Sequence, residues 1–316
     1  MGREKAQVEK GLERELSRQV QALDDGRALV DLTWWRKVLV DGADAAGWLN
    51  DLMAADLSRM QASEARRSLL LSPTGRVRAD VTVIRLEEGH LLAQDPAQPE
   101  AIDAVLDRYV LSSEVTMADR TAELALLALP NLTDPPQEEE LPDEWETVRP
   151  SSLGPGVGLI GPVSGRDRVR RAVARLAPEL VEVFEPAVEA WRIARGVARF
   201  PVDLTSESLP HEADVGDAMA YNKGCYLGQE AVARVANLGH PPFLLLPLRS
   251  EAPVSAGDPV LADDEDVGTV TSATPLESGG SALIARVRWA ARDSTLRTAT
   301  GSGPAPLTRP ASSASA

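Results

Sequence analysis

The feature that most narrows how this chain can fold is its single cysteine, Cys225, among 316 residues. One thiol cannot form a disulfide within the chain, complete a four-cysteine zinc site or hold an iron–sulfur cluster by itself. The three histidines, His90, His211 and His240, are widely scattered and show no metal-ligand spacing. We therefore expect no metal site, and a fold that is held together by a hydrophobic core.

The composition allows such a core. Hydrophobic residues make up 43% of the chain, an ordinary fraction for a globular protein, and 316 residues suffice for two or three domains. Asp and Glu number 48 against 33 Lys and Arg, which gives a net charge of −15. Such a surface repels phosphate backbones, so we expect no nucleic-acid partner, although one local basic pocket could still bind a small anion.

The sequence also favours a particular compartment. The first residues, Met1 to Gln7, are charged and lack the apolar core of a secretory signal. No run of about 20 apolar residues is present, so no membrane partner or membrane span is expected. We predict a location in the reducing cytoplasm, where a single unpaired thiol is stable.

Cys225 lies in a segment, Asn222 to Arg234, with the features of a reactive-thiol loop. Two glycines flank the cysteine and allow a tight turn, and the good helix formers after Gly228 predict a helix that begins near Leu227. Lys223 places an ammonium two residues from the thiol. A nearby cation and a helix N-terminus both favour a thiolate. The alternative is a small residue buried under a helix, which is common for free cysteines; the polar neighbours favour the reactive interpretation.

The positions from Lys223 to Glu230 read Lys-Gly-Cys-Tyr-x-Gly-Gln-Glu. This pattern resembles the signature of the YgfZ family of folate-binding proteins, relatives of the glycine-cleavage T protein, and the resemblance covers roughly residues 20–298. It implies an α+β fold: a T-protein-like folate-binding body of two α/β subdomains, a C-terminal antiparallel β-barrel, and a central channel onto which the cysteine loop opens. It also implies tetrahydrofolate as the cofactor.

The hydrophobic pattern predicts the elements of the body. Expected strands are 28–32, 37–40, 68–71, 77–84, 114–117, 124–129 and 156–160, and expected helices are 3–23, 42–52, 99–111, 166–176 and one that ends at Gly196. Residues 130–152 are acidic and contain Pro135, Pro136 and Glu138 to Glu140. We interpret them as a mobile, solvated loop or insertion.

Asp80 follows the predicted hairpin turn at Pro73-Thr74-Gly75. Many T proteins carry two adjacent acids after the turn glycine, and the resemblance aligns them with Ala79-Asp80, so one acid is missing. This argues against aminomethyl transfer. Asp80 is either a folate contact or a solvated strand position, and the sequence leaves both open.

A second stretch, Trp191 to Asp203, resembles the T-protein segment that supplies a carboxylate to the pterin ring. That carboxylate position is Ala194 here, so the resemblance implies weaker or differently oriented pterin binding. Arg192 and Arg199 are candidates for the glutamate tail of a folate, with surface salt bridges as the alternative.

Glu212 lies in a Leu-Pro-x-Glu pattern that also resembles the family. It is a candidate pterin contact, although a role in ordering its loop is favoured. We expect no catalytic pairing between its neighbour His211 and Cys225.

The C-terminal residues complete the predicted division of the chain into domains. Short strands at 243–248, 259–261, 267–272 and 282–287 predict a small antiparallel barrel, and the last residues are poor in large apolar groups. The expected domains are 1–24, an N-terminal helical extension; 25–240, the folate-binding body; 241–298, the barrel; and 299–316, a disordered tail.

The resemblance to the YgfZ family implies a tetrahydrofolate-binding accessory protein in the assembly or repair of iron–sulfur enzymes. Its partners would be a reduced folate and iron–sulfur client enzymes or assembly factors. Cys225 would supply a thiolate that Lys223 activates, while Tyr226, Gln229 and Glu230 shape the loop and offer hydrogen bonds. Whether the thiolate acts as a nucleophile, a redox group or a transient cluster ligand stays open. The alternatives are a folate-dependent aminomethyltransferase or methyltransferase, and a scaffold that binds no folate.

Overall fold

The computed structural model describes residues 2–111, 113–133, 141–300 and 303–310. The chain divides into two compact units. The N-terminal unit comprises residues 1–73, 78–185 and 216–229, and the C-terminal unit comprises residues 74–77, 186–215 and 230–316. Among the described residues, no helix combines the length and the apolar character needed to cross a bilayer.

The first sheet of the N-terminal unit has five strands in the order β10-β1-β7-β9-β8. Its strands are β1 (Ala28–Asp31), β7 (Leu124–Pro130), β8 (Glu146–Val148), β9 (Gly156–Pro162) and β10 (Val181–Val183). Only the β1–β10 pairing is parallel. Helix α4 (Arg166–Leu176) turns Val169 and Val173 into the core beneath this sheet, as its apolar spacing dictates.

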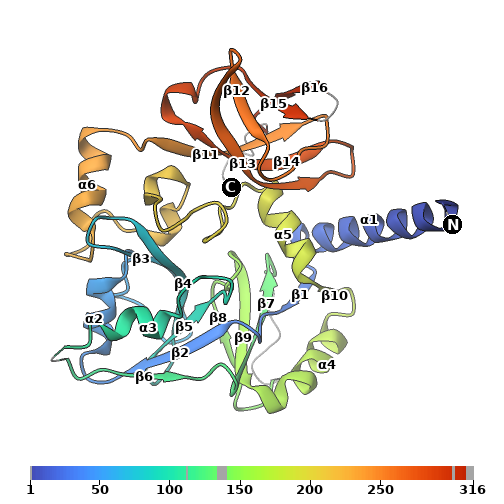
Figure 1. The fold of residues 1–316 in the computed structure, drawn as a ribbon. Coiled ribbons are helices and arrows are strands. Elements are labelled where there is room, and N and C mark those ends of the chain that lie inside the picture. Colours follow the sequence, from blue (N-terminus) through green and yellow to red (C-terminus); the bar gives the residue numbers. More distant parts are fainter. Residues whose placement is uncertain (1, 112, 134–140, 301–302, 311–316) are drawn as a thin grey trace. The chain divides into compact units, whose positions relative to one another are not determined.

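Helix α1 (Gly2–Asp24) precedes this sheet. In Figure 1 it is the blue helix, and its last turn is packed: Ala22 and Leu23 are buried, whereas Leu12 is 73% exposed. The predicted N-terminal helix is confirmed.

The second sheet of the N-terminal unit has the order β3-β4-β5-β2-β6. Its strands are β2 (Arg36–Asp41), β3 (Ala65–Leu71), β4 (Val77–Arg85), β5 (His90–Gln94) and β6 (Thr116–Asp119). Helices α2 (Ala45–Leu52) and α3 (Ile102–Asp107) pack on it around a buried aliphatic cluster. Leu227, far along the chain, packs against the same cluster. This contact joins the cysteine segment to the N-terminal unit.

The C-terminal unit contains α5 (Glu185–Ala194), α6 (Gln229–Leu238) and one six-stranded sheet of order β11-β14-β13-β12-β15-β16. The strands are β11 (Phe243–Ser250), β12 (Pro259–Ala262), β13 (Glu265–Pro275), β14 (Ser281–Arg288), β15 (Leu296–Thr300) and β16 (Gly303–Leu307). All five pairings are antiparallel. The register shifts between Val270 and Ser272, and such irregularities bend a strand. The sheet curls into a half-barrel, orange to red in Figure 1, which confirms the predicted fold class.

Two expectations for chain segments need correction. Residues 130–152 are not simply a solvated loop, because they include β8 and because Leu141 and Trp145 are buried. Trp145 packs against the bare backbone at Gly161 and Gly165, where a Cβ would lie under 3 Å from the indole. Pro135, Pro136 and Glu138 to Glu140, on which the prediction of a solvated loop was based, lie outside the described residues.

The second correction concerns the tail. Residues 303–307 form β16, which pairs with β15, and Ala305 and Leu307 are buried. Thr308 then pairs with Arg249 of β11 through two backbone hydrogen bonds of 2.8 and 2.9 Å. The scarcity of large apolar residues suggested disorder, but proline is tolerated in an edge strand, and Ala305 and Leu307, at alternate positions, supply a buried face. Residues 301–302 and 311–316 lie outside the described part of the chain.

Candidate functional site

The thiol loop, residues 220–227, belongs to the N-terminal unit, and its two ends are attached to the last turn of α2 and to the residues that follow it. The amide of Ala220 donates to the carbonyl of Ala54 at 2.8 Å, and the amide of Leu227 donates to the carbonyl of Asp51 at 3.0 Å. Cys225 lies between these attachments, and its side chain is exposed. The alternative of a cysteine buried under a helix is therefore wrong.

Lys223 makes the third attachment. Its Nζ donates to the carbonyls of Asn50, Met53 and Ala55 at 2.6, 2.7 and 2.8 Å. Burial lowers the pKa of Lys223 to about 8, although the charges of nearby Asp56 and Asp51 act in the opposite direction. The ammonium is directed at backbone oxygens. The prediction that Lys223 activates the thiol thus receives no support from its hydrogen bonds.

Tyr226 anchors the loop from the other side of Cys225. It is buried, its ring lies 5.2 Å from Lys223 Nζ in a cation–π contact, and burial raises its pKa to about 12. That Tyr226 shapes the loop stays a prediction.

The predicted helix starts later than expected. Helix α6 begins at Gln229, because Gly228 has a φ of +81°, which is outside the helical region. Cys225 therefore lies four residues before the helix, and the field of a helix end decreases within one turn. Gln229 is half-buried in the first turn of α6 and Glu230 is exposed beside it.

Asp80 on β4 is neither solvated nor free. Arg67 donates to both of its carboxylate oxygens, from Nε at 3.0 Å and from Nη2 at 2.6 Å, and the Asp80 side chain is only 14% exposed. The side-chain amide of Gln98 also bonds Asp80: its Oε1 accepts from the backbone N–H of Asp80, and its Nε2 donates to the backbone carbonyl of Asp80. The carboxylate is held as one half of a bidentate ion pair.

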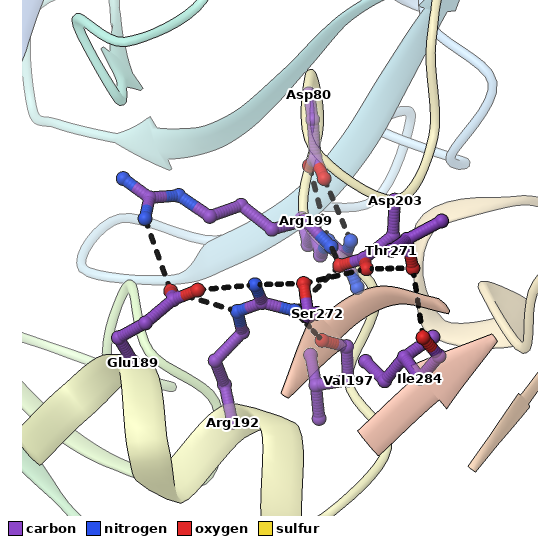
Figure 2. A network of polar contacts seen from close by, with 10 residues as sticks. Asp80, Glu189, Arg192, Val197, Arg199, Asp203, Thr271, Ser272 and Ile284 are labelled. Carbon is purple, nitrogen blue, oxygen red and sulfur yellow. Dashed lines mark hydrogen bonds and ion pairs between the residues drawn. The ribbon is translucent and has the colours of Figure 1, made fainter. Parts of the chain in front are cut away.

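Arg192 belongs to a buried polar network in the C-terminal unit (Figure 2). From α5 it donates to Glu189 at 2.9 and 2.5 Å, to Asp203 at 2.5 Å and to Ser272 Oγ at 2.8 Å. Its side chain is 8% exposed. The predicted alternatives were a folate tail contact and a surface salt bridge; the structure shows a buried ion pair.

Asp203 is the centre of this network, and its side chain is fully buried. It accepts hydrogen bonds from Thr271 Oγ1 at 2.5 Å, from Ser272 Oγ at 2.8 Å and from the amide of Arg199 at 3.0 Å. Figure 2 shows these groups converging between α5 and the strand that carries Thr271 and Ser272. The network thereby joins α5 to the half-barrel within one unit.

Arg199 donates to Glu189 at 3.0 Å, so Glu189 is shared by two arginines. Burial alone would raise the pKa of Glu189, but its hydrogen bonds and the charges of Arg192 and Arg199 lower it. Glu189 is therefore ionised. Sequence reasoning missed both Glu189 and Asp203; the only signal was the three-residue spacing of Glu189 and Arg192 on one predicted helix.

Glu212 is also engaged. It is buried, one carboxylate oxygen accepts from the amide of Leu209 at 3.1 Å, and the other accepts from Arg286 Nε at 3.1 Å. This is the loop-ordering arrangement that the sequence favoured over a pterin contact.

These contacts test whether the predicted residues suit a reduced folate. The charged groups of Asp80, Arg192 and Glu212 are all bonded to other side chains, and Arg199 is bonded to Glu189. A folate would have to compete with these ion pairs. These four residues do not form a site that fits a folate. Among the described residues, no group of three or more His, Cys, Asp or Glu side chains is placed to hold a metal ion.

Comparisons with known proteins agree with the architecture. Residues 5–130 match the family model described as the GCVT N-terminal domain. The crystal structure of glycine cleavage system aminomethyltransferase T from Bartonella henselae superposes with a TM-score of 0.78, covering 92% of this chain and 88% of that one at 19% identity. The chain has the aminomethyltransferase fold.

Three curated relatives extend this result. A chloroplastic protein of Arabidopsis thaliana, provisionally named a transferase, is 25% identical over 82% of this chain, and the match spans only 65% of that relative's length. An aminomethyltransferase of Shouchella clausii is 27% identical over 82% of this chain and 77% of its own. The tRNA-modifying protein YgfZ of Sodalis glossinidius is 25% identical over 79% of this chain and 82% of its own.

Proposed function

We propose that this protein is a tetrahydrofolate-binding accessory protein that acts in the assembly or repair of iron–sulfur enzymes. The observation that carries the proposal is the exposed thiol of Cys225, which projects from a loop fixed at three points. A thiol presented in this way suits contact with a partner molecule. Aminomethyl transfer has no need of it.

Folate binding is supported by the aminomethyltransferase fold and by the GCVT N-terminal match. It is not supported by the charged residues chosen from the sequence, because those are engaged in ion pairs. The tRNA-modifying YgfZ relative supports the resemblance to the YgfZ family, on which the accessory role rests.

The thiol is tested with Cys225→Ser in cells whose iron–sulfur enzyme activity depends on this protein. We expect the activity of the client enzyme to fall, while Asn222→Ser, an exposed substitution on the same loop, leaves it unchanged. Equal amounts of folded variant protein must be verified. Full client activity with Cys225→Ser would remove the thiol from the function.

The second candidate is a folate-dependent aminomethyltransferase. The fold and the name of the Shouchella relative favour it. Against it, Ala79 is buried where many T proteins carry an acid, and the neighbouring Asp80 is paired with Arg67. Incubation of the protein with tetrahydrofolate and an aminomethyl donor separates the two: formation of methylene-tetrahydrofolate would favour the enzyme.

Calorimetry with reduced folate tests the binding itself. A binding protein gives heat and a higher melting temperature at saturating ligand. The absence of both would favour a scaffold that has kept the fold and lost the ligand.

A further inference from the structure

The end of helix α2 leaves two backbone carbonyls without their usual partners. Within a helix, the carbonyls of Asn50 and Asp51 would accept from the amides of Ala54 and Ala55. Those two amides instead donate to the carbonyl of Leu69 and to Ser68 Oγ, at 2.8 and 3.0 Å. The α2 terminus therefore needs donors from elsewhere in the chain.

The thiol loop supplies those donors. Lys223 Nζ bonds the carbonyl of Asn50, and the amide of Leu227 bonds the carbonyl of Asp51. The same ammonium also bonds the carbonyls of Met53 and Ala55 in the following turn. An ammonium has three N–H donors, so all three have a carbonyl acceptor within 2.8 Å.

The position of Lys223 in the loop is as important as its bonds. Ala220 and Leu227 are attached at the two ends, and Lys223 is attached between them, two residues before Cys225. Tyr226, directly after the cysteine, is buried. Gly224 and Cys225 are the exposed residues of the tip between these anchors. Fixing both sides of a short tip limits the directions in which its side chain can point.

We propose that Lys223 is the positioning residue of Cys225: by capping the end of α2 it holds the thiol loop in the shape that presents the thiol. The inference deepens the proposed function and rests on it for its biological meaning, while the capping itself is independent of any client. Lys223 acts on the thiol through the backbone, since its three donors are used by carbonyls.

The chain contains a matched control for this role. Lys37 on β2 is also a buried lysine of the N-terminal unit, its Nζ donates to the carbonyls of Thr33 and Trp35 at 2.7 and 2.6 Å, and burial lowers its pKa to about 8. Neither acceptor belongs to the thiol loop or to the α2 turn. Lys37→Met removes a comparable ammonium without touching the α2 cap.

The experiment compares Lys223→Met, Lys37→Met and the parent protein in two measurements. Hydrogen exchange reads the protection of the Ala220 and Leu227 amides. The pH dependence of iodoacetamide alkylation reads the apparent pKa of the thiol, which is unambiguous because Cys225 is the sole cysteine.

For Lys223→Met we expect protection of the two amides to fall about tenfold beyond any change in the slowest-exchanging core amides, because buried acceptors are left unsatisfied. In Lys223→Met the thiol pKa should be unchanged. In Lys37→Met the protection of the Ala220 and Leu227 amides should change no more than that of the slowest-exchanging core amides of the same variant. Unchanged amide protection in Lys223→Met would overturn the proposal, as would a raised thiol pKa, which would assign Lys223 to activation. Since no client enzyme takes part, failure of the iron–sulfur role would leave these results intact.

Discussion

The thiol loop of the N-terminal unit is held by the half-buried Lys223 and the polar network of the C-terminal unit by the buried Arg192, yet the two regions leave different groups available. Lys223 bonds neutral backbone carbonyls, and the one reactive side chain nearby stays exposed. Arg192 bonds the carboxylates of Glu189 and Asp203, and the opposite charges neutralise one another. The comparison shows that a cation beside a motif does not identify a binding site; what the cation bonds decides whether any chemistry remains.

The largest expected effect is on the Arg192 network. Arg192→Met leaves the fully buried Asp203 carboxylate without its cation, which costs about 3–5 kcal/mol of unfolding free energy. Urea denaturation at pH 7 measures this, with the exposed Arg171→Met of α4 as the control. A loss below about 1 kcal/mol would mean that Asp203 is not held as an ion in the fold.

The two regions should also differ in their response to pH. The pKa of Lys223 is lowered from 10.5 to about 8, so between these values the unfolded chain binds a proton that the folded chain has released. Stability should therefore rise as the pH increases from 8 to 10.5, by up to about 3 kcal/mol for this group. Denaturation of the parent and of Lys223→Met across this range isolates the increment as their difference. A constant difference would contradict the assignment.

Glu189 should respond at the opposite end of the scale. Its pKa is lowered below 4.5, so the stability it contributes is present above pH 4.5 and is lost as the pH falls through the lower, folded-state value. Glu189→Gln should cost about 1–3 kcal/mol at neutral pH, because two arginines lose a charged partner. The difference from the parent should shrink below pH 4.5, which acid-range denaturation checks; a pH-independent difference would indicate a packing effect.

A smaller effect is expected at Ser272, which donates to Asp203 and accepts from Arg192. Ser272→Ala removes one buried hydroxyl while the ion pair remains, at a cost of about 1 kcal/mol. Thermal unfolding measures it. A loss as large as that of Arg192→Met would show that the hydroxyl, rather than the ion pair, organises the network.

The smallest effect on stability belongs to the thiol itself. Cys225 is exposed, so Cys225→Ser should change the unfolding free energy by less than about 0.5 kcal/mol. Denaturation tests this directly, and a larger loss would mean that the sulfur packs against the fold.

Much of the architecture could be predicted because it depends on local periodicity. The hairpin of β3 and β4, helix α4, the end of α5 at Ala194, two residues before Gly196 with its φ of +72°, and the C-terminal sheet all follow from patterns within a few residues. The tail strand β16 was missed although its partner β15 directly precedes it, because residues 303–307 carry two prolines and only one large apolar side chain. The pairing of Thr308 with Arg249 is long-range and does not follow from a local pattern.

The candidate site divides in the same manner. The exposure of Cys225 agrees with what the motif indicates, whereas the burial of Tyr226 was not predicted. Lys223 and its partner Asn50 are 173 residues apart in the sequence, and Asp80 and its partner Arg67 are 13 residues apart. Arg192 and Glu189, by contrast, lie within one turn of the same helix. Sequence patterns identify charged residues but do not show which opposite charge the fold places beside them, and for that reason the predicted folate contacts proved to be ion pairs.

The pairing of Thr308 with Arg249 has a consequence for synthesis of the chain on the ribosome. Strand β11 emerges early in the C-terminal unit, but its partner beyond β16 is translated more than 50 residues later, as the two residue numbers show. Domains generally fold as they emerge, N-terminal first. The backbone groups of Arg249 on this edge of β11 therefore have no strand partner until residue 308 has been released, and an unpaired strand edge is open to wrong pairing in the meantime.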